Sequence, residues 1–213
     1  MSSLINLYNL DLLTKGGPVM FILLGFSVLA LFIIILKLIQ FSIVRVSNTN
    51  SIDNIISKLN KTNAKKLLSE IQKIKNPIAK IIEVVIITKH DRRFNRESRE
   101  SEISRISSIQ IRNLENYLGG LEVIASISPL LVLFGTVLGM IKAFLNLEKA
   151  GSQVDPALLA GGIWEALLTT AFGLAVAIPA LTAYHLFENK ISNTKDKMKD
   201  SIIRVNTLLD FKK

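Results

Sequence analysis

The sequence contains no cysteine, which excludes disulfide bonds, thiol chemistry and cysteine-ligated zinc. It also lacks the Gly-x-x-x-x-Gly-Lys-Ser/Thr pattern of phosphate-binding loops, so ATP is not the expected energy source. Its two histidines, His90 and His185, are isolated and do not have the spacing of metal ligands. We therefore expect no enzyme activity, no metal site and no cofactor.

Aromatic residues are scarce in the region that carries most of the positive charge. The chain has a formal net charge of +9, which raises the hypothesis of a nucleic-acid-binding protein. Between Val46 and Arg112, however, the only aromatic ring apart from that of His90 is Phe94. Surfaces that bind single-stranded nucleic acid combine basic residues with aromatic rings. The sequence therefore disfavours nucleic acid as a partner.

Charge is nearly absent from three long stretches. Each stretch holds one charged residue: Lys37 in residues 18–41, Lys142 in residues 123–147, and Glu165 in residues 158–187. A helix needs roughly 20 apolar residues to cross the ~30 Å hydrocarbon core of a bilayer. The sequence therefore predicts three transmembrane helices, at residues 18–41, 119–147 and 158–187.

Basic residues are distributed unevenly around the predicted spans. Fifteen Lys and Arg lie between Arg45 and Arg112, and seven follow the third span. The segments before the first span and between the second and third hold one each. Because basic loops stay in the cytoplasm, we expect the N-terminus outside and a cytoplasmic C-terminus. Met1–Leu13 lacks basic residues and no small-residue cleavage site follows the first span, so this span is expected to remain uncleaved. The expected segments are an outer amphipathic segment at 1–17, a cytoplasmic helical region at 42–118, an outer loop at 148–157 and a cytoplasmic helix at 188–213.

The polar regions have helical rather than strand periodicity. Apolar spacing in Asn48–Asn76 predicts two short amphipathic helices, with Ser51 as a candidate cap, and Pro77 is expected to begin a third. The apolar pattern runs from Asn95 without a breaker toward Gly119–Gly120, so Asn95–Leu147 is expected to be one long helix that includes the second span. The predicted fold is an all-α membrane protein with three transmembrane helices and long helices that extend into a cytoplasmic helical bundle.

Glu165 is the residue that most directly suggests a function. A carboxylate at membrane depth costs about 2.5–3.5 kcal/mol on insertion scales, so such residues face protein or a wet cavity and suggest an ion pathway. Counting from the loop between the second and third spans places Thr136 and Thr170 at similar depth, and Glu165 opposite Met140. Hydroxyl groups both donate and accept hydrogen bonds, so they can pass a proton or hold water. The alternatives are threonines bonded to their own helix and a purely structural Glu165.

Small residues recur along the second and third spans. Such residues allow close helix packing in lipid, either within one chain or in an oligomer. Three spans alone can hardly enclose a hydrated path, which favours the oligomer. The predicted packing residues are Gly135, Gly139 and Gly173, with Ala166, Thr170 and Ala177 on the third-span stripe and bends at Pro129 and Pro179.

Two runs of these residues resemble the signatures of a known family. The run ISPLLVLFGTVLGMI (127–141) resembles the second-span signature of the ExbB/TolQ/MotA proton-channel family, and GIWEALLTTAFGLAVAIPA (162–180) resembles the third-span signature. With the three-span layout, the resemblance covers essentially the whole chain. Gly17–Pro18 before the first span is most similar to the ExbB branch, and the further span usual in MotA proteins is missing.

The resemblance implies a proton-channel stator subunit of a bacterial inner-membrane motor, with its N-terminus in the periplasm. Such subunits form a pentamer around a dimeric single-span partner of the ExbD, TolR or MotB type, which carries the proton-binding aspartate. By motif position, Thr136 and Thr170 match the pore threonines and Glu165 matches the third-span glutamate. The expected work is TonB-linked uptake across the outer membrane. A TolQ-type role in envelope maintenance and a non-conducting membrane scaffold are the alternatives.

Two residues depart from the family pattern. Val132 stands where glycine is frequent, and Trp164 precedes Glu165 where a small residue is usual. We expect Val132 to loosen the close helix approach and Trp164 to anchor the third span near the outer interface. A solute transporter with its own substrate site is disfavoured, because three spans contain no inverted repeat.

Overall fold

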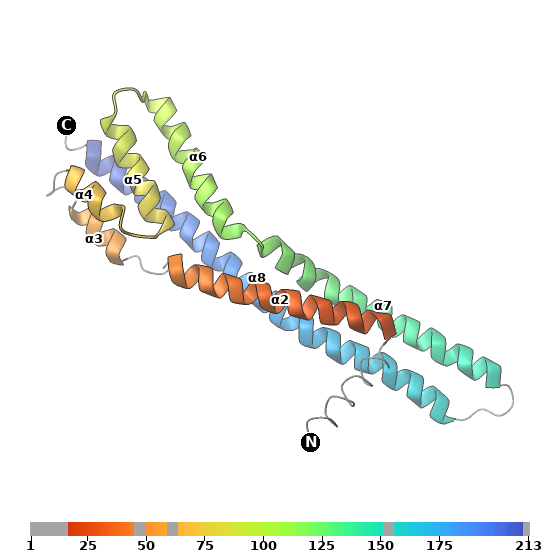
Figure 1. The fold of residues 1–213 in the computed structure, drawn as a ribbon. Coiled ribbons are helices and arrows are strands. Elements are labelled where there is room, and N and C mark those ends of the chain that lie inside the picture. Colours follow the sequence, from red (N-terminus) through yellow and green to blue (C-terminus); the bar gives the residue numbers. More distant parts are fainter. Residues whose placement is uncertain (1–16, 45–49, 59–63, 151–155, 211–213) are drawn as a thin grey trace, which may run out of the picture. The chain divides into compact units, whose positions relative to one another are not determined.

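The computed structural model describes residues 17–44, 50–58, 64–150 and 156–210, and every regular element in this part of the chain is an α-helix (Figure 1). The helices are α2 (Gly17–Val44), α3 (Asn50–Lys58), α4 (Ala64–Ile71), α5 (Pro77–His90), α6 (Arg96–Glu115), α7 (Leu118–Ala150) and α8 (Pro156–Asp210). Three of them are long and apolar enough to cross a membrane: α2, α7 and α8. The predicted all-α fold with three candidate spans is therefore confirmed.

The chain divides into two compact units. The membrane unit comprises Met1–Ile35 and Tyr117–His185, and the bundle unit comprises Leu36–Asn116 and Leu186–Lys213. The residues of α2 and α8 are therefore shared between the two units. The membrane unit contains most of the apolar sequence, and the bundle unit contains the amphipathic helices α3 to α6.

In the membrane unit, α7 and the first half of α8 run antiparallel and touch through small residues (Figure 1). A Cβ built on Gly139 would lie 3.1 Å from the Cβ of Ala166, and one on Gly162 would lie 2.4 Å from the Cβ of Ala143. The first turns of α2 pack against both helices: Val19 and Leu23 form a buried cluster with Val132 of α7, and Phe172 of α8 packs against that cluster. Close backbone contact through small side chains is how apolar helices associate in lipid.

Gly17 allows α2 to begin where it does. Its φ of +67° lies in the left-handed region, which glycine adopts without a Cβ clash. Pro18 follows as the next residue of the helix, where a missing backbone N–H costs little. The sequence Gly-Pro therefore starts the first candidate span.

The bundle unit is held together by a core of aliphatic side chains. α5 contributes more of them than any other helix, including Ile78, Ile81, Ile82, Val85 and Ile86, each no more than 1% exposed. Other members come from α3, α4, α6 and the last part of α8. α5 and α6 begin at asparagine caps: the Asn76 side chain accepts from the N–H of Ile78, and the Asn95 side chain accepts from the N–H of Ser98.

The expectation of one helix over Asn95–Leu147 is wrong. α6 ends at Glu115 and α7 begins at Leu118, and Tyr117 between them has a φ of +66°. A non-glycine residue in the left-handed region ends a helix, because the following backbone can no longer continue the hydrogen-bond ladder. The polar helix and the second candidate span are therefore separate elements, joined at Asn116–Tyr117.

Other expectations have mixed outcomes. Pro77 does begin α5, and two short helices do precede it, but Ser51 lies inside α3 rather than before it. Glu148–Ala150 belong to α7, so the connection to α8 is shorter than the expected loop. The N-terminal segment expected to be amphipathic lies outside the described residues, as do residues 151–155.

Candidate functional site

Glu165 forms an ion pair with Lys142, the one charged residue of the second apolar stretch. The Lys142 Nζ lies 3.3 Å from Oε1 and 3.4 Å from Oε2 of Glu165. The Glu165 side chain is 25% exposed and that of Lys142 is 64% exposed. The carboxylate of α8 is therefore directed toward a cation on α7 rather than toward the apolar exterior.

A pocket of about 120 Å³ adjoins this ion pair. The start of α2, α7 and α8 all contribute to its lining, and within the described part of the chain Lys142 and Glu165 are the charged residues of that lining. Thr169 adds a hydroxyl group, and the other lining residues are glycine or apolar: Gly17, Pro18, Val19, Gly135, Leu138, Gly139 and Ala166. A liquid water molecule occupies about 30 Å³, so this space suits several waters that the charged groups can bind.

The contacts between α7 and α8 establish which residues lie at the same level. Gly135 meets Thr169, since a Cβ on Gly135 would lie 2.9 Å from the Thr169 Cγ2. Thr136 and Thr170 are the next residues along each helix, so they lie at nearly the same depth. Gly139 meets Ala166 in the same way, which places Met140 level with Glu165, as loop counting predicts.

The predicted residues nevertheless lie on two different sides of the α7–α8 pair. A helix turns by about 100° per residue. Thr136 follows the contact residue Gly135, and Thr170 follows the contact residue Thr169. In an antiparallel pair, a one-residue step along each helix turns both side chains toward the same side of the pair. Lys142 precedes the contact residue Ala143, and Glu165 precedes Ala166, so both lie on the opposite side. The structure thus brings the two threonines to one side and the ion pair to the other.

Each threonine hydroxyl bonds to its own helix. Thr136 donates to the carbonyl of Leu133 at 2.7 Å, and Thr170 donates to the carbonyl of Ala166 at 3.2 Å. Both side chains are half-buried, so part of each remains accessible in the single chain. A hydroxyl that donates to a backbone carbonyl still has acceptor capacity, so these groups can receive a hydrogen bond from water or from another helix.

Sequence reasoning missed two residues of this site. Thr169 is 2% exposed, lines the pocket and donates to the carbonyl of Glu165 at 3.1 Å. Lys142 supplies the counter-charge of Glu165. Its position was the available signal, because it lies two residues from Met140 and therefore within one helical turn of the level of Glu165.

The predicted packing residues lie in different environments. Gly135, Gly139 and Gly173 are in close contact with neighbouring helices. Pro129 and Pro179 lie inside α7 and α8 at exposed positions of the single chain. Their role in packing stays a prediction.

Val132 does not loosen the helix approach, so that expectation is wrong. A Cβ on Gly173 would lie 1.8 Å from the Val132 Cγ2, which means that the valine side chain occupies the space above this glycine. Val132 is 5% exposed and belongs to the buried cluster with α2. Trp164 is exposed in the single chain, and its interfacial role stays a prediction.

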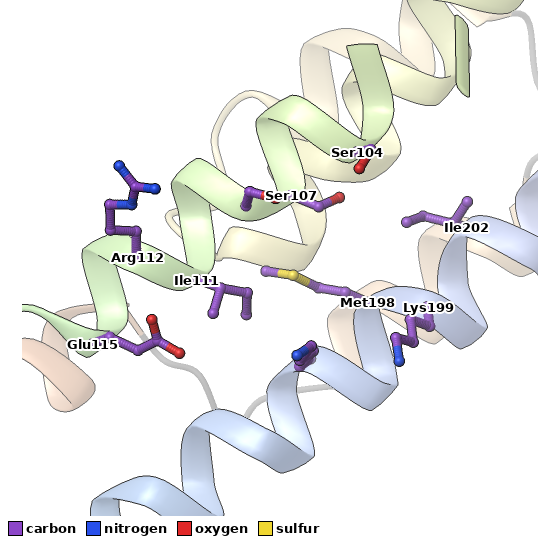
Figure 2. A pocket seen from close by; sticks show the side chains of 10 residues that line it. Ser104, Ser107, Ile111, Arg112, Glu115, Met198, Lys199 and Ile202 are labelled. Carbon is purple, nitrogen blue, oxygen red and sulfur yellow. The ribbon is translucent and has the colours of Figure 1, made fainter. Parts of the chain in front are cut away.

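A second cavity, of about 460 Å³, lies in the bundle unit between α6 and α8 (Figure 2). Ile111 and Met198 lie between the two helices, and Glu115 and Lys199 lie at the polar edges (Figure 2). Its remaining lining residues are Ser104, Ser107, Ser108, Arg112, Lys195 and Ile202. None of the predicted pathway residues lines this cavity.

Comparison with known proteins gives consistent matches. A model of the MotA/TolQ/ExbB proton channel family matches residues 54–200. The chain is 31% identical over 191 residues to the putative biopolymer transport protein ExbB homolog of Methanothermobacter thermautotrophicus, which covers 89% of this chain and 66% of that protein. It is 39% identical over 98 residues to the biopolymer transport protein ExbB of Pseudomonas putida, covering 46% and 30% of the two chains. It is also 39% identical over 100 residues to the Tol-Pal system protein TolQ of Haemophilus influenzae, covering 47% and 43%.

The chain therefore spans less than two thirds of the length of these curated relatives. Its fold and site define an all-α membrane protein with three candidate spans and an ion pair between two of them. The family match extends over most of the chain and includes both signature runs. The chain belongs to the MotA/TolQ/ExbB proton channel family, a family of transport subunits of the inner membrane and not of enzymes. The names of the relatives, ExbB more often than TolQ, agree with the resemblance to the ExbB branch.

Proposed function

We propose that this chain is the proton-channel subunit of an inner-membrane motor, which converts the proton motive force into work on a periplasmic partner. One charge that crosses 100 mV releases about 2.3 kcal/mol, so a few protons can drive a substantial conformational change. The expected orientation has the N-terminus in the periplasm and the C-terminus in the cytoplasm, because most Lys and Arg lie in residues 45–112 and after the third span.

The observation that carries this proposal is the environment of Glu165. Its carboxylate lies in an apolar helix, is paired with Lys142 and lines a pocket that also contains the Thr169 hydroxyl. An ionisable residue at membrane depth that faces another polar group marks an ion pathway more often than a packing contact. We assign to Glu165 the control of water access to the pathway.

Thr136 and Thr170 are assigned to the proton path itself. They lie at one level on the side of the hairpin opposite the Lys142–Glu165 pair, and both are half-buried in the single chain. A ring of several copies, expected to be a pentamer, would direct this side toward a central partner helix. Their hydroxyl groups can hold water or position a proton without carrying charge themselves.

The partner is expected to be a dimer of single-span proteins of the ExbD or TolR type. The three apolar stretches contain no aspartate, so this chain does not supply the proton-binding aspartate that the family resemblance implies. The P. putida relative is named a biopolymer transport protein and the H. influenzae relative a Tol-Pal system protein. We favour TonB-linked uptake over envelope maintenance because the ExbB name is the more frequent among the relatives.

Proton flux into liposomes that contain the chain and its partner tests the proposal. We expect flux in the wild type, its loss in Thr170→Val, and a strong reduction in Glu165→Ala. Both variants should assemble normally, because valine has nearly the shape of threonine and the Glu165 side chain is only partly buried. Equal flux in all three samples would favour the alternative of a non-conducting scaffold.

One observation favours that scaffold. The hydroxyls of Thr136 and Thr170 both bond to carbonyls of their own helices, which is the ordinary arrangement of threonine in a membrane helix. Thr182→Val provides a matched control, because the exposed Thr182 also donates to its own helix, at the carbonyl of Ile178, and does not line the pocket. Flux that falls in Thr170→Val and persists in Thr182→Val would separate a pathway role from the general loss of a helix-bonded hydroxyl.

A further inference from the structure

We propose that Lys142 is a specificity-determining residue, whose ammonium group keeps sodium and other metal cations off the Glu165 carboxylate. This inference rests on the proposed function, because it concerns which cations the proposed proton channel admits. Cation binding at Glu165, however, can be measured without any flux.

The geometry places one ammonium group against both carboxylate oxygens. The Lys142 Nζ lies 3.3 Å from one oxygen of Glu165 and 3.4 Å from the other. Metal cations such as calcium and magnesium are bound through oxygen ligands, with carboxylates prominent among them. An ammonium group has three donors and no acceptor, so it occupies the carboxylate and cannot itself coordinate a metal.

The charge balance of the pocket strengthens this exclusion. Among the described residues, Lys142 and Glu165 are the only charged ones that line it, so the pair adds no net charge and no second described carboxylate compensates an arriving cation. Removal of the ammonium would leave a carboxylate beside the Thr169 hydroxyl, with room for water. This combination of oxygen donors and one negative charge is suited to a small cation.

Protons differ from metal ions in what they require. A proton moves along hydrogen-bonded water and hydroxyl groups by exchange of donors and acceptors, and it needs no shell of oxygen ligands. The neutral ion pair therefore leaves a hydrated route for protons, while it removes the Glu165 carboxylate as a ligand for a metal ion.

Sodium binding to the purified full-length chain, followed by ²³Na NMR line broadening, tests the inference. We expect weak binding in the wild type and binding tighter by about tenfold or more in Lys142→Met. This variant lacks the positive charge that repels sodium from the Glu165 carboxylate. Lys142→Gln should behave in the same way, and Lys142→Arg should exclude sodium like the wild type. The gain should disappear when Glu165→Gln is combined with Lys142→Met.

Lys149→Met is the matched control, since Lys149 is an exposed lysine of the same helix that does not line the pocket. Circular dichroism establishes that each variant is folded. The inference is overturned if folded Lys142→Met and Lys142→Gln bind sodium as weakly as the wild type. A gain that persists without the Glu165 carboxylate would also overturn it.

Flux separates this inference from the proposed function. In liposomes with the partner, sodium should leave wild-type proton flux unchanged and should inhibit the flux of Lys142→Met. Absence of proton flux in the wild type would contradict the proposed function alone. Absence of added sodium binding in the Lys142 variants would contradict this inference alone.

Discussion

The Lys37 side chain closes the C-terminus of α6, because its Nζ donates to the carbonyl oxygen of Leu114 at 2.6 Å. The same Nζ donates to the Gln40 side chain at 2.9 Å, and Gln40 donates to the carbonyl of Asn113 at 2.8 Å. The last carbonyls of a helix have no partner within the helix, and a cation there also interacts favourably with the helix dipole. Two polar side chains of α2 thus supply hydrogen-bond donors to the carbonyls that α6 leaves unpaired at its end, just before Tyr117.

Replacement of Lys37 by methionine should destabilise the bundle unit. Lys37 is 1% exposed, and its loss would leave the buried Leu114 carbonyl without a donor, at a cost of about 1–3 kcal/mol. Thermal unfolding of the detergent-solubilised chain measures the effect. The exposed Lys190 provides the control, and Lys190→Met should change the midpoint little. Equal midpoints for the two variants would show that the hydrogen bond contributes nothing.

Two adjacent glycines of α8 should respond oppositely to alanine. A Cβ on Gly162 would lie 2.4 Å from the Ala143 Cβ and 3.1 Å from its Cα, whereas a Cβ on Gly161 meets nothing within 4 Å. Gly162→Ala should therefore separate α7 from α8 and cost about 1–3 kcal/mol. Gly161→Ala should be neutral or should stabilise by up to about 1 kcal/mol, because alanine favours helix.

Unfolding in detergent distinguishes these two variants. Addition of Ala143→Gly to Gly162→Ala should restore part of the lost stability, since it removes the methyl group that causes the clash. If Gly162→Ala is as stable as Gly161→Ala, the close contact between α7 and α8 does not exist in the folded chain.

Asp91 should remain ionised well into the acid range. A side-chain hydrogen bond from Arg93, together with a backbone hydrogen bond from the same residue, lowers the pKa of Asp91 from 3.8 to about 2. Because the folded-state pKa is depressed, the stability that this pair adds is present above pH 3.8 and is lost as the pH falls toward 2. A ¹³C NMR titration of the Asp91 carboxyl measures this pKa, which should return toward 3.8 in Arg93→Gln. An unchanged titration in that variant would contradict the assignment of its cause.

The depth of the site residues could be predicted from sequence, but their rotation could not. Counting from the loop is sufficient to place Thr136 level with Thr170, because two helices of a hairpin rise equally per residue. It does not reveal which face each helix turns toward its neighbour. That depends on the contact residues Gly139 and Ala166, which become known only when the helices are packed. The separation of Glu165 from Thr170 was missed for this reason.

The end of α6 also depends on contacts distant in sequence. No glycine or proline marks Asn116–Tyr117, so local signals predict that the helix continues. The donors that pair with the last carbonyls of α6 come from Lys37 and Gln40, more than 70 residues earlier in the sequence. Local apolar periodicity was sufficient for α5, where the proline that begins the helix and the buried face are both encoded in adjacent residues.

The accessibility of Thr136 and Thr170 to water in the assembled membrane complex tests the central claim most directly. Since the native chain has no cysteine, single cysteines at these positions can be probed with a charged methanethiosulfonate without background reaction. The thiolate is the reactive form, so reaction requires a hydrated site. Ile141→Cys and Ile178→Cys, at exposed apolar positions, are the controls. We predict rapid modification of Thr136→Cys and Thr170→Cys and little modification of the controls; threonine positions as unreactive as the two isoleucine positions would contradict the proton pathway.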